Sequence, residues 1–403
     1  MNKETYAMSC LIGEVKSNPY PVFFDPHRAC MVNKPPVSLV TGSPGSGKTF
    51  FALSLATQAS ICGKVGAILD PKGDFVCLSK MAKLGYVNNV KVWSLLNLDS
   101  TVSANNEGML DPTMFENDVA SNVTLTIDVI KMLVGNLTSK QNAFLAPIIQ
   151  DVISKGRNPS FSKVVQKLME QRDDELRSLG ASLNIILQTP LSKLLVINKN
   201  VERKPLELGD GFVVLNLMGL ELPPNNKEIS SYSTNERVSV CIMSLVTKMV
   251  FKLLRVMPKT IFKTLIIDEA WTLMATESGR DLINQSALLG RSLNMSTILL
   301  TQLAKHIDVG DTSTLDTTIS TRFAFRNDDA EDNLITVEAM KLPIGEGWET
   351  TIPELETGDC LMQDINGGLS FIHVVVQDEW GEIFNTNPLQ AIKDAKKEKN
   401  LIS

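Results

Sequence analysis

Short apolar runs bounded by turn residues recur towards both ends of this chain. They span residues 37–41, 65–70, 90–95, 212–217, 262–267, 296–301 and 320–326. The first several are short and mostly apolar, which is typical of strands covered by helices on both faces of a parallel sheet. A last pair, 359–365 and 369–377, is separated by Asn366, Gly367 and Gly368, which predicts a β-hairpin near the C-terminus. We therefore predict an α/β protein with a mostly parallel sheet.

The middle of the chain follows a helical pattern instead. The stretch "TSKQ" (138–141) has the form of a capping box, in which the first and last side chains satisfy backbone N–H groups at a helix start. Gly156 and Pro159 interrupt the helix that follows, and a second helical pattern resumes after them. We predict an all-α insertion over 116–205, and a core formed by 1–115 and 206–403.

The most apolar long segment, 238–257, carries one polar stripe. Ser244, Lys248, Lys252 and Arg255 recur at spacings that place them on one side of a helix. This pattern predicts a mostly buried helix that is too charged to span a membrane. The first 20 residues lack the apolar core of a secretory signal, so we expect a protein that stays in the cytoplasm.

Composition restricts the possible chemistry. At 403 residues the chain is long enough for two domains, or for one large domain with an insertion. Its net charge of −6 gives no global basic surface, so a nucleic-acid contact would need a local patch or a channel between subunits. Six scattered cysteines without a C-x-x-C pair, and three histidines, argue against a structural zinc site or a disulfide framework.

The stretch "GSPGSGKT" (42–49) matches the phosphate-binding loop pattern G-x-x-x-x-G-K-[ST] at every fixed position. It follows a predicted strand and precedes a helical segment, where backbone N–H groups and the helix N-terminus can point at anionic oxygens. Lys48 is expected to contact the β- and γ-phosphates, and Thr49 to hold Mg²⁺. The alternative, a glycine-rich surface turn, does not explain the whole match. The predicted ATP-binding residues are Gly42, Ser43, Pro44, Gly45, Ser46, Gly47, Lys48, Thr49 and Phe50.

Two carboxylates follow the apolar run in "TLIIDEAW" (264–271). In a P-loop ATPase an acid at the end of a neighbouring strand completes the magnesium shell, a role that we assign to Asp268. Glu269 is then placed to orient and polarise the water that attacks the γ-phosphate. The alternative is an acidic cap for the next helix. The adjacent pair favours a hydrolase over a P-loop kinase.

Three further stretches accompany the P-loop: "ILDPKGDF" (68–75), "GMLDPT" (108–113) and the segment from "DEAW" to "TQ" (268–302). Together these motifs resemble the ATPase domain of the conjugative type IV secretion ATPases, within the FtsK–HerA superfamily of hexameric motors. The resemblance runs from about residue 21 to the last hairpin and implies a RecA-like core bearing an all-α domain. Family members usually carry a large domain before the P-loop, whereas 41 residues precede Gly42 here. The resemblance therefore implies a motor domain alone, or a short homologue that works with a separate partner.

The resemblance also implies roles for single residues. Gln302 matches the sensor glutamine, and Arg291 matches the arginine that a neighbouring subunit contributes to the ATP site. Arg322 and Arg326 are alternatives for an arginine role, and they alternate along one strand face. Asp74 resembles an acid of this superfamily, although glutamate is common at that position. On chemistry alone Gln302 could cap a strand, Asp74 and the two strand arginines could be solvated, and Trp271 is expected to pack in the core.

The predicted function is an ATP-hydrolysing ring, using ATP and Mg²⁺, that powers translocation through a conjugative channel or assembly of that channel. Its implied partners are other subunits of a homo-hexamer, channel proteins and, as a candidate, DNA. Membrane association at the inner face of the cell membrane would come through partners. The alternatives are a DNA-pumping coupling protein, a HerA-type translocase, and an ATP-dependent switch that hydrolyses weakly. Segment 225–239 balances Lys227 and Arg237 against two glutamates, so it is not a convincing DNA grip.

Overall fold

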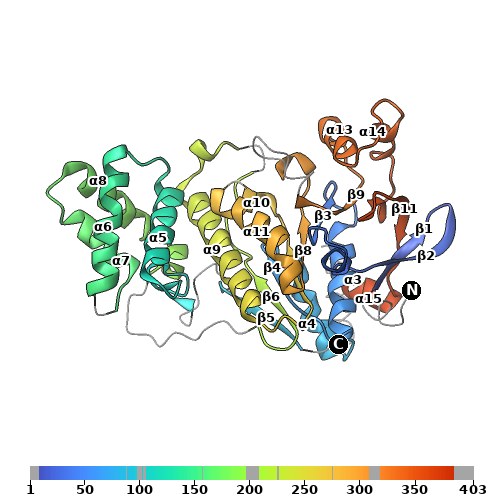
Figure 1. Ribbon diagram of the computed structural model, residues 1–403, viewed down its shortest axis with the longest axis horizontal. Helices are drawn as coiled ribbons and strands as arrows, with labels where there is room; N and C mark the ends of the chain where they lie inside the picture. Colours follow the sequence, from blue (N-terminus) through green and yellow to red (C-terminus); the bar gives the residue numbers. More distant parts are fainter. Residues whose placement is uncertain are drawn as a thin grey trace, which may run out of the picture.

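The computed structural model describes most of the chain. The described residues are 9–87, 89–97, 102, 106–156, 158–196, 208–224, 227–274, 276–307 and 318–384. Within them, eleven strands form one sheet in the order β2-β1-β11-β10-β9-β3-β8-β7-β4-β6-β5 (Figure 1).

Seven neighbouring strands of this sheet are parallel, from β9 at one side to β5 at the edge. All seven coincide with the predicted runs to within one residue at each end. They are β3 (Val37–Thr41), β4 (Val65–Asp70), β5 (Val90–Ser94), β6 (Phe212–Asn216), β7 (Lys263–Ile267), β8 (Met295–Leu300) and β9 (Thr321–Phe325).

The sheet continues past β9 as four antiparallel strands. β10 (Asp359–Gln363) and β11 (Leu369–Val374) form the predicted hairpin, and β10 pairs with β9. β1 (Cys10–Val15) and β2 (Asn18–Phe24) pair next to β11 and were not predicted. Pro19 and Pro21 lie in β2, which hides the strand signal in the sequence. An edge strand tolerates proline because one row of its N–H groups needs no partner.

The parallel strands other than the edge strand β5 are buried on both faces, which is why their sequences are mostly apolar. In β7, Leu265 and Ile267 join one core cluster and Ile266 joins the other. The first cluster packs against α9 (Thr234–Val256) and α11 (Glu277–Leu293). The second packs against α3 (Lys48–Ile61), α4 (Leu78–Lys83) and α15 (Asp378–Phe384).

The remaining short helices are α2 (Arg28–Met31), α10 (Trp271–Met274), α13 (Ala330–Ala339), α14 (Trp348–Thr351), η1 (Asp74–Cys77), η3 (Pro112–Met114), η5 (Ile229–Ser231) and η6 (Ala304–His306).

A helical insertion forms a lobe at one end of the molecule in Figure 1. It contains α5 (Val119–Val134), α6 (Ser139–Lys155), α7 (Phe161–Met169), α8 (Asp174–Ile186) and the short η4 (Pro190–Leu194). The predicted capping box is confirmed, because Thr138 and Gln141 cap each other's backbone N–H groups at the start of α6. The limits 116–205 remain a prediction, since 197–207 lie outside the described residues.

Helix α9 confirms the prediction of a largely buried helix over the most apolar segment. Its Lys252 donates to the Phe115 carbonyl at 2.9 Å and pairs with Glu116, also at 2.9 Å. The polar stripe of α9 therefore meets the chain where the insertion begins. In the part of the chain that the structure describes, no helix is both long enough and apolar enough to cross a membrane.

Gly66 provides a test of the strand packing. A Cβ atom at this position of β4 would lie 2.3 Å from the Phe212 ring and 2.7 Å from the Thr264 carbonyl oxygen. Both neighbours belong to the flanking strands, so neither can move freely. We expect Gly66→Ala to lower the free energy of unfolding by about 1–3 kcal/mol in denaturant titrations.

Gly381→Ala is the matched control. Its Cβ would lie at an ordinary 3.7 Å from the Phe50 ring, inside helix α15. Alanine favours helix over glycine, so this variant should be as stable as the wild type or slightly more stable. Equal stabilities for the two alanine variants would contradict the close strand packing around Gly66.

Candidate nucleotide site

The predicted phosphate-binding loop lies between the carboxyl end of β3 and the start of α3, as the motif requires. Gly42 and Gly47 have positive φ values of 147° and 110°. A Cβ at Gly42 would lie 2.7 Å from the Phe325 Cβ, and one at Gly47 would lie 3.2 Å from the Gly358 Cα. Both positions therefore need glycine for backbone conformation and for space.

Backbone hydrogen bonds from three other segments hold this loop. Gly42 N–H donates to the Gln302 carbonyl at 3.2 Å, and Ser43 N–H donates to the Arg326 carbonyl at 2.8 Å. Gly358 N–H, just before β10, donates to the Ser46 carbonyl at 3.0 Å. The segments after β8 and β9 and the one before β10 thus fix the loop in a single shape.

Lys48 folds back into the loop. Its ammonium donates to the Gly42 carbonyl and, at 2.9 Å, to the Ser43 carbonyl. Burial and, to a smaller extent, the nearby Lys72 together lower the pKa of Lys48 to about 8, although Asp268 and Glu269 oppose the shift. The ammonium is therefore held by dipoles that phosphate oxygens would replace with full negative charge.

Asp268 follows β7 and is 5% exposed. Burial raises the pKa of its carboxyl to about 7, although Lys72 opposes the shift. Among the described residues its Oδ2 atom is buried without a hydrogen-bond partner. A buried, unpartnered carboxylate oxygen fits Mg²⁺ or a water bound to it. Thr49, the other predicted metal ligand, lies in the first turn of α3.

Three donors converge on the carboxylate of Glu269. The Trp271 Nε1–H group donates to Oε2 at 2.6 Å, and the Gln302 Nε2–H group donates to Oε1 at 3.3 Å. The Lys72 ammonium forms an ion pair with Oε1. Burial raises the pKa of Glu269, but Lys72 and the two neutral donors outweigh it and hold the pKa below its usual value. Glu269 is thus an ionised carboxylate at the mouth of the loop.

The structure brings Gln302 to Glu269, where a sensor glutamine would act. Trp271 is buried as expected, and its indole N–H also fixes the Glu269 carboxylate. Glu269 itself has a φ of 52°, a conformation that non-glycine residues rarely adopt and that is common at functional sites.

Lys72 is a site residue that the sequence analysis missed. It lies in the loop after β4, which Asp70 shapes by accepting N–H groups from Gly73 at 2.8 Å, Asp74 at 3.0 Å and Phe75 at 2.9 Å. The stretch "DPKGDF" shows a lysine just past a buried strand, but nothing local says that β4 lies beside β7. Asp74 lies near Lys72 and Glu269, and burial raises its pKa.

The three arginine candidates lie in different places. Arg291 is exposed in the last turn of α11, which ends just before β8 begins. It therefore lies at the amino edge of the parallel strands, opposite the P-loop of its own chain. Arg326 follows β9 beside the P-loop, and its Nε atom is buried without a partner among the described residues.

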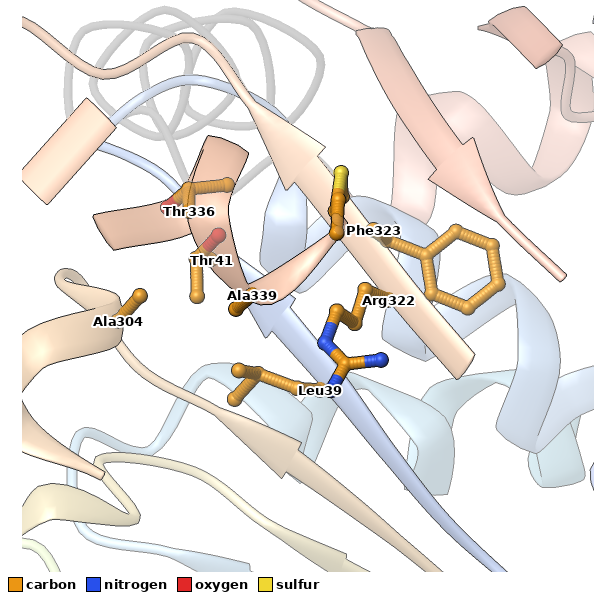
Figure 2. Close-up of a pocket in the computed structure, with 8 residues that line it drawn as sticks. Leu39, Thr41, Ala304, Arg322, Phe323, Thr336 and Ala339 are labelled. Carbon is orange, nitrogen blue, oxygen red and sulfur yellow. The ribbon is translucent and has the colours of Figure 1, made fainter. Parts of the chain in front are cut away.

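Arg322 is buried in β9, so the interpretation as part of a solvated strand face is wrong for this residue. Its Nη1–H group donates to Gln363 Oε1 at 3.1 Å. Figure 2 shows its guanidinium pointing towards Leu39 in a small cavity. The other lining residues are Thr41, Ala304, Phe323, Thr336, Ala339 and Met340.

A second polar network connects the P-loop with the segment after β8. Ser43 Oγ donates to Asn327 Oδ1 at 3.3 Å, and Asn327 Nδ2–H donates to Asp332 at 2.7 Å. The buried Asp332 also accepts the N–H groups of Ala304 at 2.9 Å and Lys305 at 2.7 Å. Hydrogen bonds thus connect Ser43 of the P-loop to the backbone just beyond Gln302.

The basic residues of segment 227–239 are engaged within the chain. Lys227 pairs with Glu236 at 2.6 Å, and Arg237 donates to the Ile229 carbonyl at 3.0 Å. Residues 225–226 lie outside the described residues.

The buried Asp268 predicts a pH-dependent cost in stability. Because its folded pKa of about 7 lies above the ordinary value of 3.8, the folded state is penalised progressively as pH rises between these values. We expect Asp268→Asn to raise the free energy of unfolding by about 1–3 kcal/mol at pH 8, with the gain vanishing near pH 4. Denaturant titrations without nucleotide at both pH values measure this difference. The exposed Glu354→Gln is the control and should change stability at neither pH, whereas a gain for Asp268→Asn that persists at pH 4 would exclude the electrostatic cause.

Comparisons with known proteins identify the family and the fold of this chain. Residues 25–384 match the family described as the AAA-like domain. The chain is 21% identical over 376 residues to the uncharacterized protein YddE of Bacillus subtilis (strain 168), and it covers 44% of that protein's length. It therefore spans less than half of this curated relative.

Two solved structures share the fold. VirB4 of Thermoanaerobacter pseudethanolicus superposes with a TM-score of 0.71 at 17% identity, over 92% of this chain and 97% of that one. The bacterial conjugative coupling protein TrwBΔN70 gives a TM-score of 0.57 at 12% identity, over 91% of this chain and 97% of that one. The resemblance inferred from the motifs is thus confirmed at the level of fold. The family match over residues 25–384 shows that this chain belongs to the AAA-like domain family.

Proposed function

We propose that this chain is an ATP-hydrolysing motor domain that acts as a ring in a type IV secretion apparatus for DNA or protein transfer. One observation carries the proposal: the glycine-rich loop, Lys48, Asp268, Glu269 and Gln302 meet at the carboxyl ends of β3, β7 and β8. This is the arrangement that phosphoryl transfer to water needs, with a phosphate cradle, a metal-binding acid and a water-positioning base.

When bound, Mg²⁺·ATP supplies the phosphoryl group and the charge that activates it. The loop amides and the N-terminus of α3 would hold the phosphates. Lys48 would leave the carbonyls of Gly42 and Ser43 for phosphate oxygens, while Thr49 and Asp268 hold the metal. Glu269, fixed by Trp271, would orient the attacking water and take its proton. Gln302 would link the position of Glu269 to the end of β8.

The position of Arg291 favours a ring. An exposed arginine on the edge opposite its own P-loop is available to the site of a neighbouring copy, where a guanidinium stabilises the transferring phosphoryl group. We propose a homo-hexamer, with channel proteins as further partners and with membrane attachment at the inner face of the cell membrane through those partners. The fold shared with VirB4 and TrwB supports this setting.

One observation favours a slower activity in the isolated domain. Three donors occupy the Glu269 carboxylate, which leaves it a weak base until one of them departs. A switch that binds ATP and hydrolyses it weakly is therefore the second candidate. TrwB is a conjugative coupling protein with the same fold. A DNA-pumping coupling protein is therefore a further alternative, in which the same motor would move DNA.

Glu269→Gln separates the motor from the switch. Without a carboxylate to position water, we expect ATP turnover to fall at least about 100-fold while ATP affinity is kept or improved. Single-turnover assays with radiolabelled ATP, together with equilibrium binding, measure both quantities. Glu354→Gln, a surface change of the same type, should leave both unchanged. Wild-type turnover in Glu269→Gln would refute the role of Glu269.

The neighbour's contribution can be tested by mixing two inactive variants. Arg291→Ala keeps its own Lys48, and Lys48→Ala keeps its own Arg291, so some interfaces of a mixed ring contain both groups. Random mixing at equal amounts should restore roughly a quarter of wild-type turnover if Arg291 acts across the interface. No recovery on mixing, or full activity in Arg291→Ala alone, would remove Arg291 from the site.

A further inference from the structure

Lys72 holds the catalytic candidate Glu269 from outside the motifs that define the site. Its ammonium forms an ion pair with Glu269 Oε1, the oxygen that Gln302 also contacts. The Lys72 side chain is 48% exposed, whereas that of Glu269 is 6% exposed. One partner of this pair is therefore fixed in the core, and the other can leave through solvent without disturbing packing.

The loop that carries Lys72 is itself rigid. Asp70 accepts three consecutive N–H groups, those of Gly73, Asp74 and Phe75, and Phe75 is fully buried. The lysine side chain is consequently the flexible part of this arrangement, with four methylene groups joined by rotatable bonds on an anchored backbone. Movement of Lys72 requires no movement of the loop.

Lys72 lies in the field of several acids and close to the P-loop lysine. Burial alone would lower its pKa, but Asp268, Glu269 and Asp74 raise it, so the ammonium stays charged. It also lowers the pKa of Lys48, so the two ammonium groups lie close enough to repel each other. Both are held by local acceptors: Lys48 by loop carbonyls, and Lys72 by Glu269.

We propose that Lys72 is a γ-phosphate sensor. Its ammonium forms an ion pair with Glu269 in the nucleotide-free subunit and moves to contact the γ-phosphate when ATP is bound. The proposal rests on the nucleotide site assigned above. A terminal phosphate carries more negative charge than one carboxylate, so it competes well for a mobile ammonium. Once Lys72 leaves, Trp271 and Gln302 still hold the carboxylate in place, and Oε1 loses its ion-pair partner and can accept a hydrogen bond from water instead. Whether Glu269 is free to bind the attacking water then depends, through Lys72, on the presence of the γ-phosphate.

The test is a double-mutant cycle on the preference for ATP over ADP. Equilibrium binding of Mg²⁺·ATPγS and Mg²⁺·ADP is measured for the wild type, Lys72→Met, Glu269→Gln and the double variant. Lys72→Met should reduce the preference for ATPγS about tenfold, because the contact to the γ-phosphate is lost. Glu269→Gln should increase it by freeing Lys72, and this increase should be absent in the double variant.

Two control variants test whether the effect requires a positive charge at position 72 itself. Lys72→Arg keeps the charge and should retain most of the preference, while Lys80→Met removes an exposed lysine from nearby α4 and should change nothing. Thermal melts without nucleotide check that each variant is folded. An unchanged preference in Lys72→Met would overturn the proposal, and so would an equal loss of affinity for both nucleotides, which marks a structural role.

The outcomes separate this inference from the proposed motor function, because binding is measured without turnover. A protein that binds both nucleotides and never hydrolyses ATP would refute the motor, yet the cycle would still decide the role of Lys72. Conversely, a hydrolysing protein whose ATP preference ignores Lys72 would keep the motor and refute the sensor.

Discussion

The site depends on one constraint, the parallel pairing of β3, β8, β7 and β4 in that order. Parallel strands end at the same edge of a sheet, so each of these four delivers the residues after its last position to one place. They are the P-loop after β3, Gln302 after β8, the acidic pair after β7 and Lys72 after β4. An order that removed β7 from its place between β8 and β4 would separate Glu269 from Gln302 or from Lys72.

This convergence concentrates charge where water is scarce. Asp268 and Glu269 are each 5% exposed, and they respond differently to burial. Asp268 has a raised pKa and an oxygen without a partner among the described residues, whereas Glu269 is compensated by Lys72, Trp271 and Gln302. The first carboxylate suits a metal that brings its own charge, and the second suits a water that needs a held base. The fold thus accepts a local loss of stability in return for reactive groups.

The elements outside the parallel core also converge on the P-loop. The antiparallel extension brings Gly358 against Ser46 and Gly47, and the Asn327–Asp332 network joins Ser43 to the chain after β8. On the other side, Lys252 of α9 contacts Phe115, where the helical insertion begins. The P-loop is therefore hydrogen-bonded to the segments after β8 and β9 and to the start of the antiparallel extension.

The sequence by itself determined the elements whose signals are local. Short, mostly apolar runs predicted the parallel strands to within one residue, and Thr138 and Gln141 predicted the cap of α6. The spacing of Gly42, Gly47, Lys48 and Thr49 predicted the P-loop. These patterns persist in sequence because strand period, cap geometry and phosphate binding each act over a few residues.

Tertiary structure decided what depends on which strands are neighbours. The partnership of Lys72 with Glu269, the hydrogen bond from Trp271, the burial of Arg322 and the place of Arg291 at the far edge have no local signature. Strands β1 and β2 were not predicted for the same reason. β1 is defined by its pairing with β11, and the proline-containing β2 is defined by its pairing with β1. Strand order comes from the packing of the whole chain, and periodicity within a segment carries no information about it.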